Sequence, residues 1–203
     1  MSRLLSCVGH VATAAALVVS GTATLTGADA TPIIQNHRVT VWDVAPGTAV
    51  RPSAPSRDTV LFLIRDGKAQ ARFEAAGSVP APIPAGTRAM VIALDDRRPP
   101  PLPNTSGRPP AFPRAGSTKL LENDRVVVWE SEWTPGVPTP IHFHDKDVVV
   151  TYLADGALAS TDAGGQRVVS EYQIGLTRFN ARDRVHTETL VRGAGRAVMV
   201  ELK

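Results

Sequence analysis

Two histidines separated by one residue form the pattern in this sequence that is best suited to chemistry. His142 and His144 flank a single phenylalanine, and an extended backbone would place both imidazoles on one face, because side chains alternate along a strand. A rise of about 3.3 Å per residue sets them about 6–7 Å apart along the strand, so they can share one ion. His186 is the candidate third ligand. The pattern predicts a site for one divalent metal ion, and Fe, Mn, Ni and Zn all suit imidazole.

Two carboxylates and a phenol are candidates for the rest of the site. Asp147 and Glu188 are candidate catalytic proton acceptors, and the fourth ligand is one of them or a position left to water or substrate. Each has a structural alternative: a solvated strand position for Glu188, and a turn or strand-edge role for Asp147. Tyr152 is the candidate for substrate binding through its hydroxyl, with packing as the alternative. The alternative to a metal site is a barrel in which the histidines only form hydrogen bonds.

The composition excludes several classes of function. The chain has 203 residues, 43% hydrophobic and 20% charged, which is ordinary for a globular protein. The formal net charge is +3, and the basic residues lack the clustered stripe typical of nucleic-acid binding. The single cysteine, Cys7, lies in a segment that we expect to be removed. The mature protein would therefore have no disulfide and no cysteine nucleophile.

Residues 1–30 have the features of a secretory signal peptide. An early arginine precedes a mostly apolar stretch, and Ala28-Asp29-Ala30 matches the small-x-small pattern of a signal-peptidase site. An uncleaved anchor is the alternative, but His10 and the many small and hydroxylated residues make a weak spanning helix. We expect a periplasmic or secreted protein that begins at Thr31 and has no stable membrane insertion after cleavage.

Short apolar runs separated by glycine and proline predict an all-β protein. Runs of this kind with turn residues between them are typical of a sandwich or barrel. No segment keeps a period of 3.6 residues, so we expect little helix. The predicted strands are residues 39–42, 59–64, 89–94, 125–129, 148–153, 178–180 and 196–202.

The chain contains an internal repeat. Residues 36–42 resemble residues 123–129 at an offset of 87 residues, and an offset of 89 relates Asp58 to Asp147. The same offset of 89 relates three further pairs, Gly47 with Gly136, Gly67 with Gly156 and Gly86 with Gly175. A constant offset argues for duplication, with chance alignment of turn glycines as the alternative. In the first repeat, the positions of the three histidines are occupied by Ser53, Pro55 and Arg97.

A proline-rich segment joins the repeats. Residues 99–116 contain six prolines within residues 99–110 and another at position 113. Proline at this density favours an extended chain, which predicts a linker or surface strap. We therefore divide the mature chain into a degenerate repeat at residues 31–98, this linker, and a domain with the candidate metal site at residues 117–203.

The second repeat resembles the cupin superfamily. The first cupin motif, a glycine, a His-x-His pair and a later glycine, is matched by Gly136, His142, His144 and Gly156. Residues 175–186 resemble the second motif, and residues 196–203 are similar to the closing strand of small single-domain bacterial cupins. The resemblance implies a double-stranded β-helix, or jelly-roll barrel, in two cupin-like repeats: a bicupin with a degenerate N-terminal copy.

The match departs from the family pattern near the fourth ligand. The motif's glutamate falls at Val148 or Val149, and neither side chain can bind a metal. In the second motif, Ala181, Asp183 and Leu190 replace a proline, a glycine and an asparagine.

The resemblance implies a metal-dependent enzyme that acts on a small molecule, with dioxygenase or isomerase chemistry. In that interpretation His142, His144 and His186 hold the ion, a ligand set similar to that of thiol dioxygenases. The resemblance also allows a non-catalytic module that binds a small ligand. It also allows a homodimer formed through strand edges, and neither interpretation includes nucleic acid.

Overall fold

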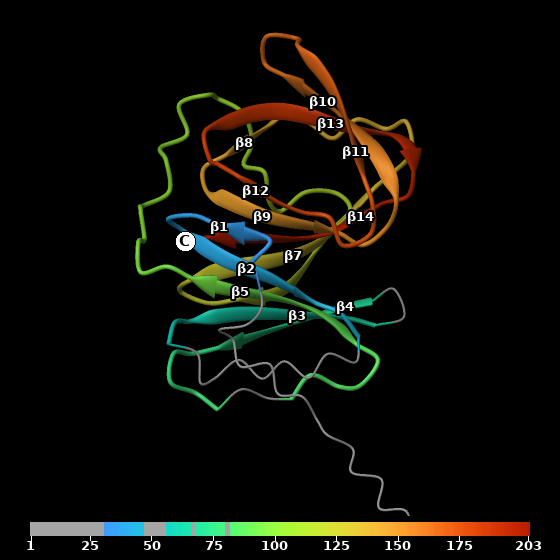
Figure 1. Ribbon diagram of the computed structural model, residues 1–203. Helices are drawn as coiled ribbons and strands as arrows, with labels where there is room; N and C mark the ends of the chain where they lie inside the picture. Colours follow the sequence, from blue (N-terminus) through green and yellow to red (C-terminus); the bar gives the residue numbers. More distant parts are fainter. Residues whose placement is uncertain (1–30, 47–55, 66–67, 80–81) are drawn as a thin grey trace, which may run out of the picture.

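The described part of the chain is built from β-strands. The structure, a computed structural model, describes residues 31–46, 56–65, 68–79 and 82–203. These residues form fourteen strands and no helix, as the sequence predicts (Figure 1). They therefore include no helix that could cross a membrane. The expected signal peptide and four positions of the repeat comparison lie outside the described residues: Gly47, Ser53, Pro55 and Gly67.

The strands form three antiparallel sheets. The N-terminal sheet has the order β1-β2-β5-β3-β4, the middle sheet β12-β9-β14-β7-β6 and the histidine sheet β11-β10-β13-β8. Figure 1 shows the middle sheet between the other two. The strand bounds are β1 Ile34–Gln35, β2 Val39–Val44, β3 Thr59–Arg65, β4 Lys68–Glu74, β5 Arg88–Leu94, β6 Ser117–Glu122, β7 Val126–Trp133, β8 His142–His144, β9 Asp147–Tyr152, β10 Gly156–Asp162, β11 Arg167–Tyr172, β12 Thr177–Asn180, β13 Arg184–Gly193 and β14 Gly195–Leu202.

Two hydrophobic cores lie on opposite faces of the middle sheet. Along β14, Val198 and Val200 join the first core, and Met199 between them joins the second. This follows from the alternation of side chains along a strand. The first core packs the middle sheet against the N-terminal sheet, where it includes Val41 and Phe62. Full burial of side chains of this size stabilises the fold by about 1.5–3 kcal/mol each.

The second core fills the barrel enclosed by the middle and histidine sheets. Trp129 and Tyr152 reach it from the middle sheet, and Leu158 and Leu190 reach it from the histidine sheet. The barrel is therefore closed by packing between two sheets of the second repeat, residues 117–203.

The strand order reveals the repeat. The N-terminal sheet, taken as β4-β3-β5-β2-β1, matches the middle sheet β12-β9-β14-β7-β6 strand for strand. Val60 of β3 pairs with Phe73 of β4, and Val149 of β9 pairs with Phe179 of β12. Val60 and Val149 are also separated by the offset of 89 found in the sequence.

Within the described residues, the first repeat contributes a sheet and not a second barrel. In the second repeat, β10 and β11 follow β9, and β13 follows β12, whereas β3, β4 and β5 follow one another within one sheet. The expectation of a barrel in each repeat is corrected accordingly. Gly86 precedes β5, which corresponds to β14, whereas Gly175 precedes β12. These two glycines are therefore not equivalent, and neither are Arg97, which follows β5, and His186 of β13.

The proline-rich segment lies along the strand that carries two histidines. Residues 99–116, here called the strap, run beside β8 (Figure 1). The Ala111 amide donates to the Phe143 carbonyl at 2.9 Å, and the Phe143 amide donates to the Pro109 carbonyl at 2.9 Å. A third bond joins the Leu102 amide to the Asp145 carbonyl at 3.0 Å. The segment is therefore a strap hydrogen-bonded to the barrel.

Candidate metal centre

Two neighbouring strands bring the three histidines together. His142 and His144 lie on β8, and His186 lies on β13. The antiparallel register sets His186 directly opposite His142 and sets Arg184 opposite His144. Residues in such pairs share one face of a sheet. All three imidazoles therefore occupy the same face, and all three are buried.

The ring nitrogens of the three histidines converge on one point. The Nε2 atom of His144 lies 3.2 Å from Nε2 of His142 and 3.0 Å from Nε2 of His186. Zinc binds imidazole nitrogen at about 2.0–2.1 Å, which spaces two nitrogens on one ion by about 3–3.5 Å. In the described residues, this trio is the one group of three or more histidine, cysteine or acidic side chains whose candidate ligand atoms all lie within 4.8 Å of one another. The donor set therefore fits a single ion.

The outer ring nitrogens help to orient two of the rings. Nδ1 of His142 lies 2.8 Å from the Pro140 carbonyl, which can only accept, so Nδ1 carries the proton and the lone pair is on Nε2. Nδ1 of His186 lies 2.9 Å from the Ser160 hydroxyl. Metal-binding histidines commonly have such partners on the second nitrogen. Nδ1 of His144 is buried and has no hydrogen-bond partner within the described part of the chain.

Electrostatics keep the histidines neutral. Burial is the main factor that lowers the pKa of all three imidazoles, and the pKa of His186 falls to about 4. The guanidinium groups of Arg114 and Arg184 act in the same direction. Neutral imidazole is the form that binds metal, so these ligands need not lose a proton at neutral pH.

Arg114 of the strap lies against the histidines. Nη1 of Arg114 donates to Nε2 of His142 at 2.9 Å, and Nη2 donates to the Glu188 carboxylate at 3.1 Å. The guanidinium carbon lies 4.9 Å from the ring centroid of Phe112 and 5.7 Å from that of Trp133. The hydrogen bond from Arg114 therefore uses the lone pair on Nε2 of His142 that a metal ion would bind. Arg114 and a metal ion would compete for this lone pair.

Comparisons with known proteins relate part of the chain to one curated protein and to several solved structures. No family model matches the chain. The β-alanine degradation protein BauB of Pseudomonas aeruginosa is 40% identical over 62 residues, which cover 30% of this chain and 61% of that protein. Solved structures with a similar fold include a cupin domain from Bordetella pertussis, with 27% identity, a TM-score of 0.40, and coverage of 47% of this chain and 96% of that one. The polyketide cyclase RemF from Streptomyces resistomycificus has 21% identity, a TM-score of 0.36, and coverage of 51% and 79%.

The fold of the second repeat is decided by its own topology and motifs. The middle and histidine sheets enclose one barrel, and the three histidines, at the positions that the resemblance to the cupin motifs assigns to metal ligands, lie together. The second repeat is a cupin barrel. The sequence prediction of an all-β protein with a cupin-like barrel in its second repeat is confirmed.

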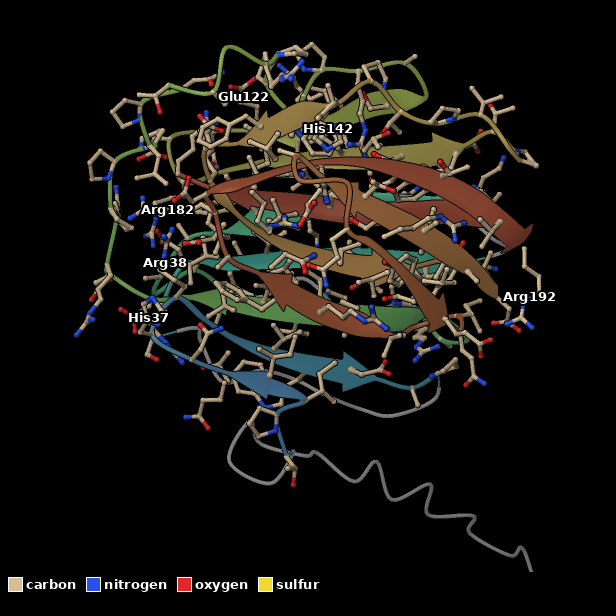
Figure 2. The ribbon with its side chains drawn as sticks, turned by 90° about the horizontal axis from the view of Figure 1, so that it is seen from above. His37, Arg38, Glu122, His142, Arg182 and Arg192 are labelled. Carbon is tan, nitrogen blue, oxygen red and sulfur yellow. The ribbon has the colours of Figure 1, made fainter. Side chains whose placement is uncertain are left out.

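Asp147 lies outside the cluster of histidines in the cupin barrel. Its carboxylate accepts hydrogen bonds from Nη1 of Arg38 at 2.5 Å and from the Arg182 amide at 2.9 Å. Figure 2 shows Arg38 and Arg182 together, apart from His142. Both carboxylate oxygens are therefore engaged elsewhere. This placement does not fit the expected role of Asp147 as ligand or proton acceptor, and it agrees with the alternative of a structural strand-edge role.

Glu188 lies beside the cluster without joining the three ligands. One oxygen accepts from Nη2 of Arg114 and from Nε1 of Trp133, each at 3.1 Å. The pKa of Glu188 lies below its ordinary value: burial raises it, and the charge of Arg114 and the hydrogen bond from Trp133 lower it. Glu188 is thus an ionised carboxylate next to the cluster, as a proton acceptor requires.

Tyr152 is part of the second core of the cupin barrel. Its ring stacks on Tyr172, with centroids 4.0 Å apart and an angle of 9° between the ring planes. Burial, and after it the charge of Glu188, raise the pKa of Tyr152 to about 12. The hydroxyl therefore stays protonated, and the observed stacking agrees with the packing alternative.

Two arginines near the cluster were missed by sequence reasoning. Arg184 stands two residues before His186, so strand alternation alone could have placed both on one face. Arg114 gave no such signal, because the proline-rich strap has no periodicity that relates it to β8. Only the fold brings Arg114 to the histidines.

Proposed function

We propose that this chain is an exported, metal-dependent cupin that acts on a small molecule. The observation that carries the proposal is the convergence of three buried Nε2 atoms, 3.0 and 3.2 Å apart, in His142, His144 and His186. Three protein ligands leave room for an exchangeable position, which is the usual plan of a catalytic site. A divalent ion in this place (Fe, Mn, Ni or Zn) supplies Lewis-acid or redox chemistry of the dioxygenase or isomerase type.

The chain's own residues have separate tasks in this proposal. The three imidazoles bind the ion, and the strap residues Phe112 and Arg114 cover the histidines and limit access of water. Phe112 lies edge-on to His144, with ring centroids 6.4 Å apart. Glu188, held ionised by Arg114, is the proton acceptor.

The substrate class is supported by one relative. BauB is named for the degradation of β-alanine, a small polar metabolite, and it matches 62 residues of this chain at 40% identity. We propose a substrate of comparable size and polarity for the cupin barrel.

Metal content of the purified chain tests the proposal. We expect close to one ion per chain by mass spectrometry after dialysis, and loss of this ion in His144→Ala. His37→Ala is the matched control, because the His37 side chain is exposed on the other repeat. A folded wild-type protein that holds no ion after incubation with Fe²⁺, Mn²⁺, Ni²⁺ and Zn²⁺ would refute the metal site.

A metal-free binding module is the second candidate. The contact that favours it is the hydrogen bond from Arg114 to Nε2 of His142, which occupies a lone pair needed by an ion. This candidate predicts that His144→Ala changes ligand binding without any change in metal content.

Export is part of the proposal and has its own test. Residues 1–30 act as the signal peptide, and the mature chain begins at Thr31. N-terminal sequencing of protein recovered from the periplasm or medium should start at Thr31. An intact Met1 on the recovered protein would contradict export with cleavage.

A further inference from the structure

Arg184 shares a sheet face with the three histidines. It lies on β13 two residues before His186, and the register sets it directly opposite His144. Opposite residues in an antiparallel pair have Cβ atoms about 4.5–5.5 Å apart on the same face. The guanidinium of Arg184 is therefore a neighbour of the ligand cluster on the side away from the His142–His186 pair.

The charge of Arg184 has no carboxylate partner among the described residues. Its one hydrogen bond there runs from Nε to the Ala181 carbonyl at 2.7 Å, and no ion pair is formed. The two nearby acidic groups are engaged: Glu188 with Arg114 and Trp133, and Asp147 with Arg38 and Arg182. The terminal nitrogens of Arg184 are thus available to a ligand.

The barrel interior around the histidines carries excess positive charge. Two arginines, Arg114 and Arg184, lie next to the cluster, and Glu188, which pairs with Arg114 at 3.1 Å, is the one carboxylate that contacts either of them among the described residues. A bound divalent ion would add two more positive charges. A partly buried charge without a partner is unfavourable, so the guanidinium of Arg184 favours binding of an anion.

We propose that Arg184 binds the carboxylate group of a small anionic substrate of the cupin barrel. The proposal rests on the proposed function and names its substrate class. The two terminal nitrogens of a guanidinium match the two oxygens of a carboxylate in a planar, bidentate pair. Arg184 sets the carboxylate beside the histidines, which also neighbour the ion pair between Arg114 of the strap and Glu188 of β13.

Binding of propanoate, with propanamide as its neutral isostere, tests this proposal. The purified chain is incubated with Zn²⁺, its metal content is measured, and each probe is titrated by calorimetry. We expect propanoate to bind at least tenfold more tightly than propanamide or inorganic phosphate. In Arg184→Gln this preference should fall to less than twofold while the zinc content stays unchanged.

Arg192→Gln is the matched control. Arg192 lies at the far end of the same strand, where its exposed guanidinium pairs with Glu171 at 2.7 Å, and the preference for propanoate should persist in this variant. Arg184→Lys should retain part of the preference, because it keeps the charge and loses the planar pair of donors.

Three results would overturn the proposal: equal binding of propanoate and propanamide, tighter binding of phosphate than of propanoate, or a full preference for propanoate in Arg184→Gln. These outcomes are separate from failure of the metal site. A zinc-loaded protein without a preference refutes this inference alone. A preference that depends on Arg184 in a protein without zinc refutes the metal site alone.

Discussion

Arg38 of the first repeat donates a hydrogen bond to Asp147 of the second, 2.5 Å away, and both side chains are buried. The reciprocal pair joins Arg125 of the second repeat to Asp58 of the first. Arg38 and Arg125 are equivalent at the offset of 87, and the two aspartates are equivalent at 89. The repeats are thus joined by two related ion pairs.

The local turns before these arginines are also related. Asn36 accepts hydrogen bonds through its Oδ1 from the amides of Arg38 and Val39, and Asn123 does the same for the amides two and three residues after it. This pattern explains why the Asn-x-Arg-Val sequence recurs: the asparagine fixes the backbone that aims each arginine across the interface.

Replacing Asp147 separates its structural role from the role of a metal ligand. Asp147→Asn should lower the free energy of unfolding by about 3 kcal/mol, because it leaves the buried charge of Arg38 without its partner. Metal content should stay at the wild-type level. Urea unfolding and metal analysis of the same preparation measure both effects.

Asp124→Asn is the control for this prediction. The Asp124 side chain is 79% exposed, and its contact with Arg98 at 3.6 Å is a surface pair, so the expected change is below about 1 kcal/mol. A folded Asp147→Asn protein that loses its metal would make Asp147 a ligand after all.

Replacing Arg114 should strengthen metal binding. Arg114→Gln removes a positive charge and reduces the competition for the lone pair on Nε2 of His142. Repulsion between charges at this range is on the order of 1–4 kcal/mol, and Glu188 offsets part of it. We therefore expect about tenfold higher zinc affinity in competition with a chelating dye. Arg108→Gln, an exposed position on the same strap, is the control, and weaker binding in Arg114→Gln would mean that Arg114 supports the site.

The metal-free protein should lose stability as the pH falls below 6.5. The buried imidazoles have lowered pKa values, about 4 for His186, so the unfolded chain binds more protons between pH 6.5 and the folded pKa. Each such histidine contributes a slope of up to about 1.4 kcal/mol per pH unit within its window. Urea unfolding between pH 6.5 and 5.5, above the range of ordinary carboxylates, measures the combined slope.

Single substitutions test whether the histidines of the cluster cause this pH dependence of the unfolding free energy. His186→Gln should reduce the slope of the unfolding free energy against pH by up to about 1.4 kcal/mol per pH unit, the contribution of one proton. His37→Gln changes an exposed side chain and should leave the slope unchanged. An unfolding free energy that is constant between pH 6.5 and 5.5 would show that the histidines are not held neutral by burial.

The sequence predicted some strands and missed others for a physical reason. All seven predicted runs fall on strands of the N-terminal and middle sheets. Strands such as β9 and β14 have nearly every side chain buried, because each face meets a core. They therefore appear as continuous apolar runs. β13 has a half-buried side and a mostly polar sequence, so its apolar pattern did not predict a strand there.

The site could be predicted only for residues whose spacing along a single strand places their side chains on the same face. The His-x-His pair has this property, and His186 was found by its motif. Asp147 was ambiguous, because its partner Arg38 lies 109 residues away along the chain. No local pattern could distinguish a carboxylate that binds metal from one that joins two repeats.

Truncating Phe112 tests whether the strap closes the site. The Phe112 ring stacks on Trp129 with centroids 5.2 Å apart and lies under the Arg114 guanidinium. Phe112→Ala should lower the free energy of unfolding by about 3–5 kcal/mol through lost packing. It should also speed zinc transfer to a chelator by several fold, because the strap then holds the barrel less tightly. Phe112→Leu, which restores most of the apolar volume, should recover most of the stability and slow zinc release again. Release at the wild-type rate from a folded Phe112→Ala protein would mean that the strap does not control access to the histidines.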